Sequence, residues 1–161
     1  MVSLLNVLMD EFDTLTMEYG IEKIKTVGDM YMAVAGVPVP AFDHATKMAD
    51  FALTMQEKVA EFNQAHQLDI KFRIGMTFGN VVAGVIGHKK FIYDLWGDVV
   101  NIASRMESTA PEGEIQITDK MASLLREDFE VVERGVVEIK GKGPMKTFLL
   151  KGRKVDRRFK E

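Results

Sequence analysis

The chain has 161 residues, of which 47% are hydrophobic and 28% charged, a composition typical of a folded protein with one core. Its 21 Lys and Arg and 24 Asp and Glu give a formal net charge of −3, which argues against a nucleic-acid partner. The absence of cysteine excludes disulfides, thiol nucleophiles and cysteine metal ligands. No apolar run reaches the roughly 20 residues of a membrane span. We therefore expect a cytoplasmic domain, either free or as the cytosolic part of a membrane-anchored protein.

The first half of the sequence predicts two helices and two hairpins. Apolar residues recur at helical spacing over residues 3–19 and again over 42–66. Between these helices, a Gly-Asp turn at 28–29 separates the apolar segments 21–27 and 30–37, a pattern that predicts a β-hairpin. Residues 70–76 then alternate, and a Gly-Asn turn leads to the apolar segment 81–86, so we expect a second hairpin there.

The second half predicts a third helix over 98–108, a short helix over 120–126, and strands over 115–118, 129–139 and 146–150. This order indicates an α+β fold, a ferredoxin-like sandwich of helices on an antiparallel sheet with extra C-terminal strands. With no repeat and no linker, we expect one domain over residues 1–152. Residues 153–161 form a basic tail, which we interpret as a solvated end rather than a site for nucleic acid or lipid phosphate.

Three blocks carry a resemblance to a known family. They are EKIKTVGDMYM at 22–32, FIYDLWGDVVNIASRME at 91–107 and ERGVVEIKGKG at 133–143. Their order and separation resemble those of class III nucleotidyl cyclase catalytic domains of the adenylyl type, and of bacterial members in particular. The resemblance runs from about Ser3 to Gly152. It implies an enzyme that converts ATP to cyclic AMP and pyrophosphate.

The resemblance also implies two divalent cations, Mg²⁺ or Mn²⁺, that activate the ribose hydroxyl and hold the triphosphate. Asp29 corresponds to one of the family's two metal aspartates. The other lies on a strand that should precede the helix beginning here near Ser3, so we expect that first family strand and its metal ligand to be missing. Asp10, Glu11 and Asp13 lie on a helix, in the wrong context to replace it. We therefore expect little or no cyclase activity from this chain alone.

Base selection is implied by two further residues. The family pattern assigns Lys25 and Asp94 to adenine, because an ammonium only donates and a carboxylate only accepts hydrogen bonds. Guanylyl members tend to carry Glu and a small polar residue at these positions. Lys23 remains an alternative to Lys25, because it lies two residues away on the predicted strand and hence on the same face.

Asn101 and Arg105 lie four residues apart, on one face of the third predicted helix. The resemblance implies that Asn101 orients the ribose and that Arg105 contacts the phosphates. Lys140 and, by a looser match, Lys89 are assigned to the triphosphate. In the family one domain supplies the metal aspartates and a second supplies the Asn and Arg. Because this chain carries both sets, we expect a homodimer, attached in its parent protein to regulatory or membrane segments.

Three alternatives remain open. The chain could be a non-catalytic cyclase-like module that dimerises and binds nucleotide, a guanylyl cyclase, or an unrelated ferredoxin-like interaction domain. Tight ATP binding without turnover would favour the first, and a comparison of GTP with ATP decides the second.

Overall fold

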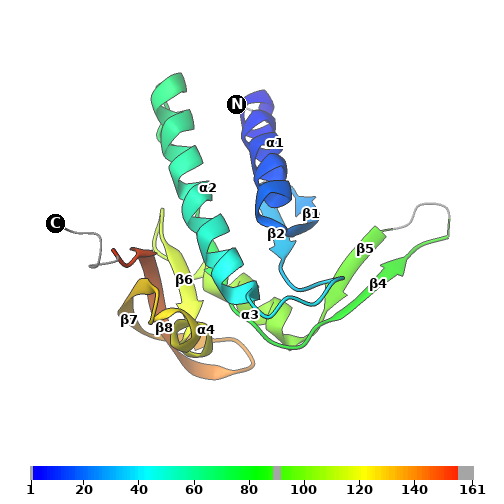
Figure 1. Cartoon of the computed structure of the whole chain (residues 1–161), viewed down its shortest axis with the longest axis vertical. Coiled ribbons are helices and arrows are strands. Elements are labelled where there is room, and N and C mark those ends of the chain that lie inside the picture. Colours follow the sequence, from blue (N-terminus) through cyan, green and yellow to red (C-terminus); the bar gives the residue numbers. More distant parts are fainter. Residues whose placement is uncertain (1, 89–91, 156–161) are drawn as a thin grey trace. The chain divides into compact units, whose positions relative to one another are not determined.

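The computed structural model describes residues 2–88 and 92–155 (Figure 1). In chain order the described elements are α1 (Val2–Tyr19), β1 (Glu22–Val27), β2 (Met30–Val34), α2 (His44–His66), β3 (Ile74–Met76), β4 (Val82–Ile86), β5 (Ile92–Trp96), α3 (Asp98–Ser108), β6 (Ile115–Thr118), α4 (Asp119–Leu125), β7 (Phe129–Ile139) and β8 (Gly143–Arg153). Among these residues, no helix combines the length and the hydropathy that crossing a bilayer requires.

The chain divides into two compact units. The first comprises Met1–Phe72 and Gly79–Asn101, and the second comprises Arg73–Phe78 and Ile102–Glu161. Helix α3 therefore begins in the first unit and ends in the second.

In the first unit, α1 and α2 run side by side (Figure 1). The helical spacing of the sequence explains this, because most of the apolar residues that recur along the two helices, among them Leu8, Phe12 and Val59, are buried. Phe12 also makes an edge contact with Tyr31 of the antiparallel β1–β2 hairpin, at 5.7 Å between ring centroids. A second antiparallel hairpin, β4–β5, completes this unit.

The second unit is built on a four-stranded sheet in the order β3-β6-β8-β7. β3 pairs with β6 in parallel, and the other pairs are antiparallel. Thr118 directly precedes helix α4, and its hydroxyl accepts a hydrogen bond from the backbone N–H of Met121 and so caps the helix. The buried apolar residues of the sheet and of α4 are Met76, Ile115, Ile117, Met121, Ala122, Leu125, Phe129, Ile139, Phe148 and Leu150.

The α+β class, the helices and most strands are confirmed, but the predicted hairpin between residues 70–76 and 81–86 is wrong. β3 pairs with β6, and β4 pairs with β5, a strand that the sequence reading did not identify. The described strands are grouped in the β1–β2 hairpin, the β4–β5 hairpin and one four-stranded sheet. The physical reason is that side-chain alternation reports the local extended conformation, whereas a strand's partner depends on contacts far along the chain.

Candidate active site

The two residues assigned to the base contact each other in the first unit. Lys25 on β1 places its Nζ 2.9 Å from Oδ2 of Asp94 on β5. The side chain of Asp94 is 13% exposed and that of Lys25 is 35% exposed. The other Asp94 oxygen accepts a hydrogen bond from the backbone N–H of Leu95 at 2.8 Å. The hydrogen bond from Lys25, followed by that from Leu95, lowers the pKa of Asp94, so this carboxyl is an ionised, purely accepting group at neutral pH.

The structure distinguishes Lys25 from Lys23. Lys23 turns to helix α1, where its Nζ lies 3.0 Å from Asp13. The two lysines were expected to share a face of a regular strand, but they have different partners, and the pairing of β1 with β2 shifts register between them. Such a bulge breaks the two-residue alternation of a strand and changes the direction of the side chains that follow.

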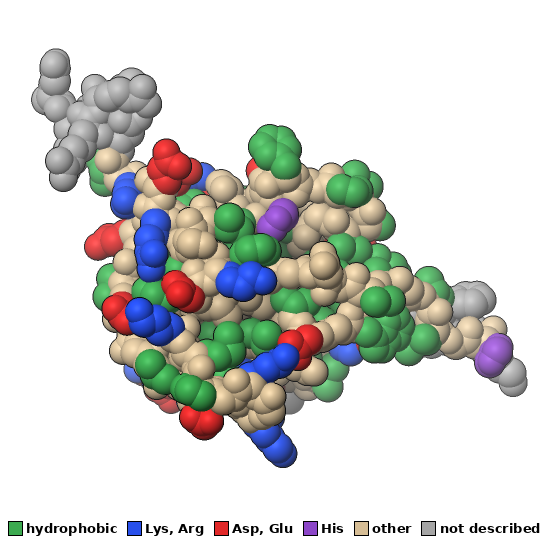
Figure 2. Space-filling model, turned by 90° about the horizontal axis from the view of Figure 1, so that it is seen from below, with side chains coloured by type: hydrophobic (Ala, Val, Ile, Leu, Met, Phe, Trp, Pro, Cys, Tyr) green, Lys and Arg blue, Asp and Glu red, His purple; other side chains and the backbone are tan. Residues whose placement is uncertain are grey.

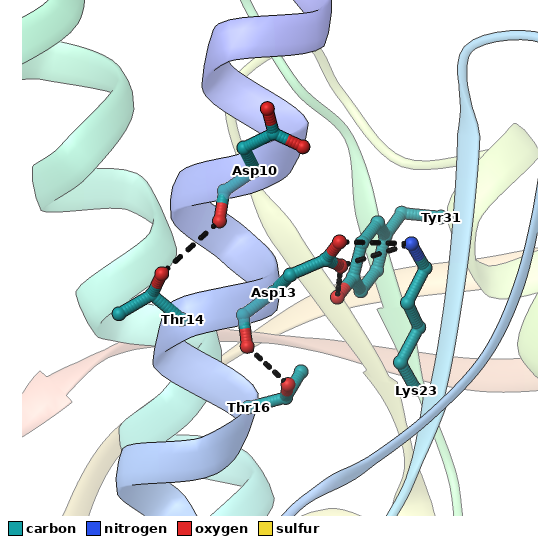
Figure 3. A network of polar contacts seen from close by, with 6 residues as sticks. All are labelled: Asp10, Asp13, Thr14, Thr16, Lys23 and Tyr31. Atoms are coloured by element: carbon teal, nitrogen blue, oxygen red, sulfur yellow. Dashed lines mark hydrogen bonds and ion pairs between the residues drawn. The ribbon is translucent and has the colours of Figure 1, made fainter.

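Asp13 contacts both strands of the β1–β2 hairpin (Figure 3). Besides its ion pair with Lys23, it accepts a hydrogen bond from the Tyr31 hydroxyl on β2 at 2.7 Å. Burial, and then the hydrogen bond to Asp13, raise the pKa of Tyr31, so its hydroxyl remains a protonated donor. The sequence reading treated Asp13 only as an unsuitable metal ligand. The apolar spacing of α1 gave no signal for its contacts, since they depend on the tertiary structure.

Asp29 lies in the turn between β1 and β2, and its side chain is exposed. Gly28 before it has a φ of 61°, a left-handed conformation that suits glycine and makes the tight turn possible. Within residues 2–88 and 92–155, no group of three or more His, Asp or Glu side chains is placed to hold a metal ion. Asp29 can therefore supply one ligand to a cation, and other oxygen atoms must complete the coordination of that cation.

Asn101 and Arg105 are exposed on α3, one helical turn apart. Asn101 belongs to the first unit and Arg105 to the second. The C-terminal half of α3 packs closely on β3, because a Cβ at Gly75 would overlap backbone atoms of Ala103, Met106 and Glu107. The backbone of this half of the helix is thus in direct contact with β3.

A buried glutamine fixes the end of the same helix. Gln116 on β6 is fully buried and donates hydrogen bonds to the carbonyl of Met106 at 2.9 Å and to the hydroxyl of Thr109 at 2.8 Å. Arg134 on β7 donates to the Gln116 side-chain oxygen at 2.6 Å and to the Thr109 carbonyl at 2.9 Å. Sequence reasoning missed both residues. The only available signal was a glutamine between two isoleucines in the segment that became β6.

The two remaining predicted residues are Lys140 and Lys89. Lys140 is exposed in the turn between β7 and β8 of the second unit. Lys89 lies outside the described residues.

Comparisons with known proteins agree with this fold and these motifs. The family model "Adenylate and Guanylate cyclase catalytic domain" matches residues 1–152. The chain therefore belongs to the adenylate and guanylate cyclase catalytic-domain family, as its three sequence blocks indicated.

Relatives within the family differ in nucleotide. An adenylate cyclase of Mycobacterium tuberculosis is 48% identical over 96% of this chain and 35% of its own length. The guanylate cyclase domain of a Catenaria anguillulae protein, solved in complex with GTP, has a TM-score of 0.90 at 39% identity and covers 96% of this chain and 85% of that one. A dimeric guanylyl cyclase domain from the fungus Blastocladiella emersonii, described as non-canonical, has a TM-score of 0.86 at 35% identity, over 95% of this chain and 84% of that one. The chain spans only about a third of the mycobacterial protein.

Proposed function

We propose that this chain is the catalytic domain of an adenylyl cyclase, which converts ATP to 3′,5′-cyclic AMP and pyrophosphate. The observation that carries the proposal is the contact between Lys25 and Asp94 at 2.9 Å. It puts one obligate donor beside one obligate acceptor, the pair that the edge of a purine base requires. The 48% identity to an adenylate cyclase supports the choice of ATP.

The pair can bind a base without separating. An ammonium has three donors, and Lys25 uses one of them on Asp94, whose two oxygens have several acceptor positions. In the proposed complex Asp94 accepts from the N6 amino group of adenine and Lys25 donates to the neighbouring ring nitrogen N1. Because the low pKa of Asp94 keeps it ionised, it cannot act as a donor in this contact.

A guanylyl cyclase is the second candidate, supported by the likeness to a domain in complex with GTP. Guanine offers an acceptor at O6 and a donor at N1, the same two groups as adenine in the opposite order. Lys25 and Asp94 would then have to contact the base in exchanged positions. An arrangement of Lys25 and Asp94 that satisfies one base places donor against donor and acceptor against acceptor when the other base binds. A mismatch with charged groups costs about 1.5–3 kcal/mol, so discrimination of roughly 10- to 100-fold is expected.

In the reaction the 3′-oxygen of the ribose forms a bond to the α-phosphorus. The bond from that phosphorus to the oxygen bridging to the β-phosphate breaks, pyrophosphate leaves, and the hydroxyl proton passes to solvent. We assign Asn101 to the ribose, Arg105 to the phosphate oxygens that gain charge, and Lys140 to the triphosphate. A planar guanidinium suits this task because it donates to two oxygens at once. All three side chains are exposed and so accessible to a ligand.

Mg²⁺ or Mn²⁺ is the proposed cofactor, with Asp29 as a ligand. Mg²⁺ is commonly held by one or two carboxylates together with substrate phosphates, so one aspartate is the smallest fitting donor set. A cation there would offset the charge of the triphosphate. Since the described residues supply this one carboxylate for the two expected ions, we expect slow turnover by the chain alone.

A second copy of the chain is the proposed partner, and its binding surface includes the β4–β5 hairpin. Val82, Val85 and Trp96 are 66%, 58% and 41% exposed there. Figure 2 shows hydrophobic side chains along this hairpin, at the right of the view. Exposed apolar side chains gathered on one element are typical of a protein interface. The greater length of the mycobacterial relative supports attached regulatory or membrane segments in the parent protein.

The test compares ATP with GTP on the purified chain in the presence of Mn²⁺. Binding of each nucleotide is measured by calorimetry, and cyclic AMP and cyclic GMP are quantified at rising protein concentration. We expect ATP to bind at least tenfold more tightly than GTP, and the product to be cyclic AMP, with a specific activity that increases with concentration. Replacing Lys25 by Glu and Asp94 by Ser should remove the preference for ATP.

A preference for GTP would assign the chain to the guanylyl cyclases. Tight ATP binding by a dimer without any cyclic product, even at the highest protein concentration, would favour a non-catalytic nucleotide-binding module.

A further inference from the structure

The β1–β2 hairpin carries Lys25 and the turn residue Asp29, and one side chain of α1 connects both of its strands. Asp13 binds Lys23 of β1 through an ion pair of 3.0 Å and Tyr31 of β2 through a hydrogen bond of 2.7 Å (Figure 3). The Lys23 ammonium also lies 5.3 Å from the centre of the Tyr31 ring. The three side chains thus form one cluster that joins helix and hairpin.

The helix beside this cluster is firmly placed. Phe12, next to Asp13 in the sequence, is fully buried and packs edge-on against Tyr31 at 5.7 Å and Phe72 at 5.6 Å between ring centroids. The carboxylate of Asp13 is therefore presented to the hairpin from a backbone that core packing holds in position.

The contacts of Asp13 flank the irregularity of β1. Residue 23 is paired with Ala33 and residue 25 with Met32, so the register shifts between the two lysines. A bulge of this kind determines which way the following side chain points. On one side of it Lys23 reaches α1, and on the other side Lys25 reaches Asp94. A β1 strand with regular pairing would direct both lysines to the same face.

We propose that Asp13 is a positioning residue for base recognition. By holding Lys23 and Tyr31, it fixes the bulged register of β1 and so directs Lys25 to Asp94. This inference rests on the proposed role of Lys25 and Asp94 in reading the purine. In this proposal Asp13 acts through Lys23 and Tyr31 and not by a contact of its own with nucleotide or metal.

The test uses Asp13→Asn, which keeps the shape of the side chain and removes its charge. Asp43→Asn is the matched control, because it removes the same charge from an exposed ion pair with Lys47 in the same unit, at 3.9 Å. Tyr31→Phe is a second, milder variant that removes only the hydroxyl donor and retains the ring beside Phe12. Two readouts are taken: the pKa of the Asp94 carboxyl by NMR, and the ratio of ATP to GTP affinity.

We expect Asp13→Asn to raise the pKa of Asp94, because Lys25 is no longer held against it. The preference for ATP should fall roughly tenfold, the effect of losing one hydrogen bond to a charged group. Affinity for inorganic tripolyphosphate should not change. Tyr31→Phe should shift both readouts in the same direction by less, and Asp43→Asn should leave them as in the unmodified chain.

An unchanged pKa of Asp94 together with an unchanged nucleotide ratio in Asp13→Asn and Tyr31→Phe would overturn the inference while leaving the proposed function intact. An unmodified chain that binds ATP and GTP equally would instead refute the proposed reading of the base. If Asp13→Asn does not fold, Tyr31→Phe alone decides between the outcomes.

Discussion

Replacing Gly75 by alanine perturbs one defined contact, the packing of β3 against α3. A Cβ built on Gly75 would lie 2.7 Å from the carbonyl carbon of Met106 and closer still to backbone atoms of Ala103 and Glu107. Ordinary contact begins at 3.4 Å, so the helix would have to withdraw by more than half an ångström. No rotamer change relieves the overlap, because all three contacts are with backbone atoms.

The magnitude follows from this geometry. Overpacking a core by one methyl group commonly costs about 1–3 kcal/mol, and occasionally more. Because the obstacle here is a helix whose end is also held by Gln116, we expect a loss of about 3 kcal/mol in the free energy of unfolding. For a chain of this size that corresponds to a fall in Tm of roughly 6–12 °C. Since α3 carries Asn101 and Arg105, which we propose bind the ribose and the phosphates, we expect cyclase activity to fall as well.

Urea denaturation and calorimetry measure the effect, with Gly152→Ala as the matched control. Gly152 is also a strand glycine, but a Cβ there meets nothing within 4 Å. The control should change the free energy of unfolding by less than about 0.5 kcal/mol. A Gly75→Ala chain as stable as Gly152→Ala would mean that α3 does not contact β3 as closely as described.

Two further predictions concern the polar contacts. Gln116→Leu should lower the free energy of unfolding by about 2–4 kcal/mol, because it removes the partner of the Met106 carbonyl and one of the two acceptors of Arg134. Gln64→Leu on the exposed face of α2 should be nearly neutral by the same denaturation assay. Lys25→Met should raise the pKa of Asp94 measured by NMR, since the hydrogen bond from Lys25 is the largest cause of its lowering, and an unchanged pKa would argue against the contact. The sign for stability follows: a carboxyl whose pKa is lowered by folding stabilises the fold at neutral pH, and this contribution is lost as the pH falls through the pKa of the folded state.

The helices could be predicted because their signal is local. The inward residues of α1 and α2 recur at the spacing of one helical face, and the structure buries most of them. The pairing of β3 could not be predicted, since its partner β6 begins 41 residues further along and the alternation of β3 contains no information about it. A turn signal at Gly79-Asn80 suggested a hairpin, but β4 pairs with β5 instead.

The candidate site shows the same difference between what the sequence motif predicts and what depends on contacts far along the chain. The sequence motif named Lys25 and Asp94, and the structure brings them into contact. The residues alone could not exclude Lys23 as the base-contacting lysine, because a regular strand places both lysines on one face. The bulge that separates them is a property of the pairing between β1 and β2. The contacts of Asp13 could not be predicted from the sequence either. A carboxylate on a helix is usually solvated, and the two partners of Asp13 come from other elements.

A lysine and an aspartate are not by themselves specific for adenine. Both purines offer one donor and one acceptor on the edge that the pair would contact, and the two bases differ in the order of these groups. If Lys25 and Asp94 read the base as proposed, selectivity depends on which of them lies opposite the exocyclic group, and hence on the direction in which β1 presents Lys25. That direction is set by the bulge and by the contacts of Asp13 with Lys23 and Tyr31. A small change in these supporting contacts could then alter the preferred nucleotide while both base-reading residues remain.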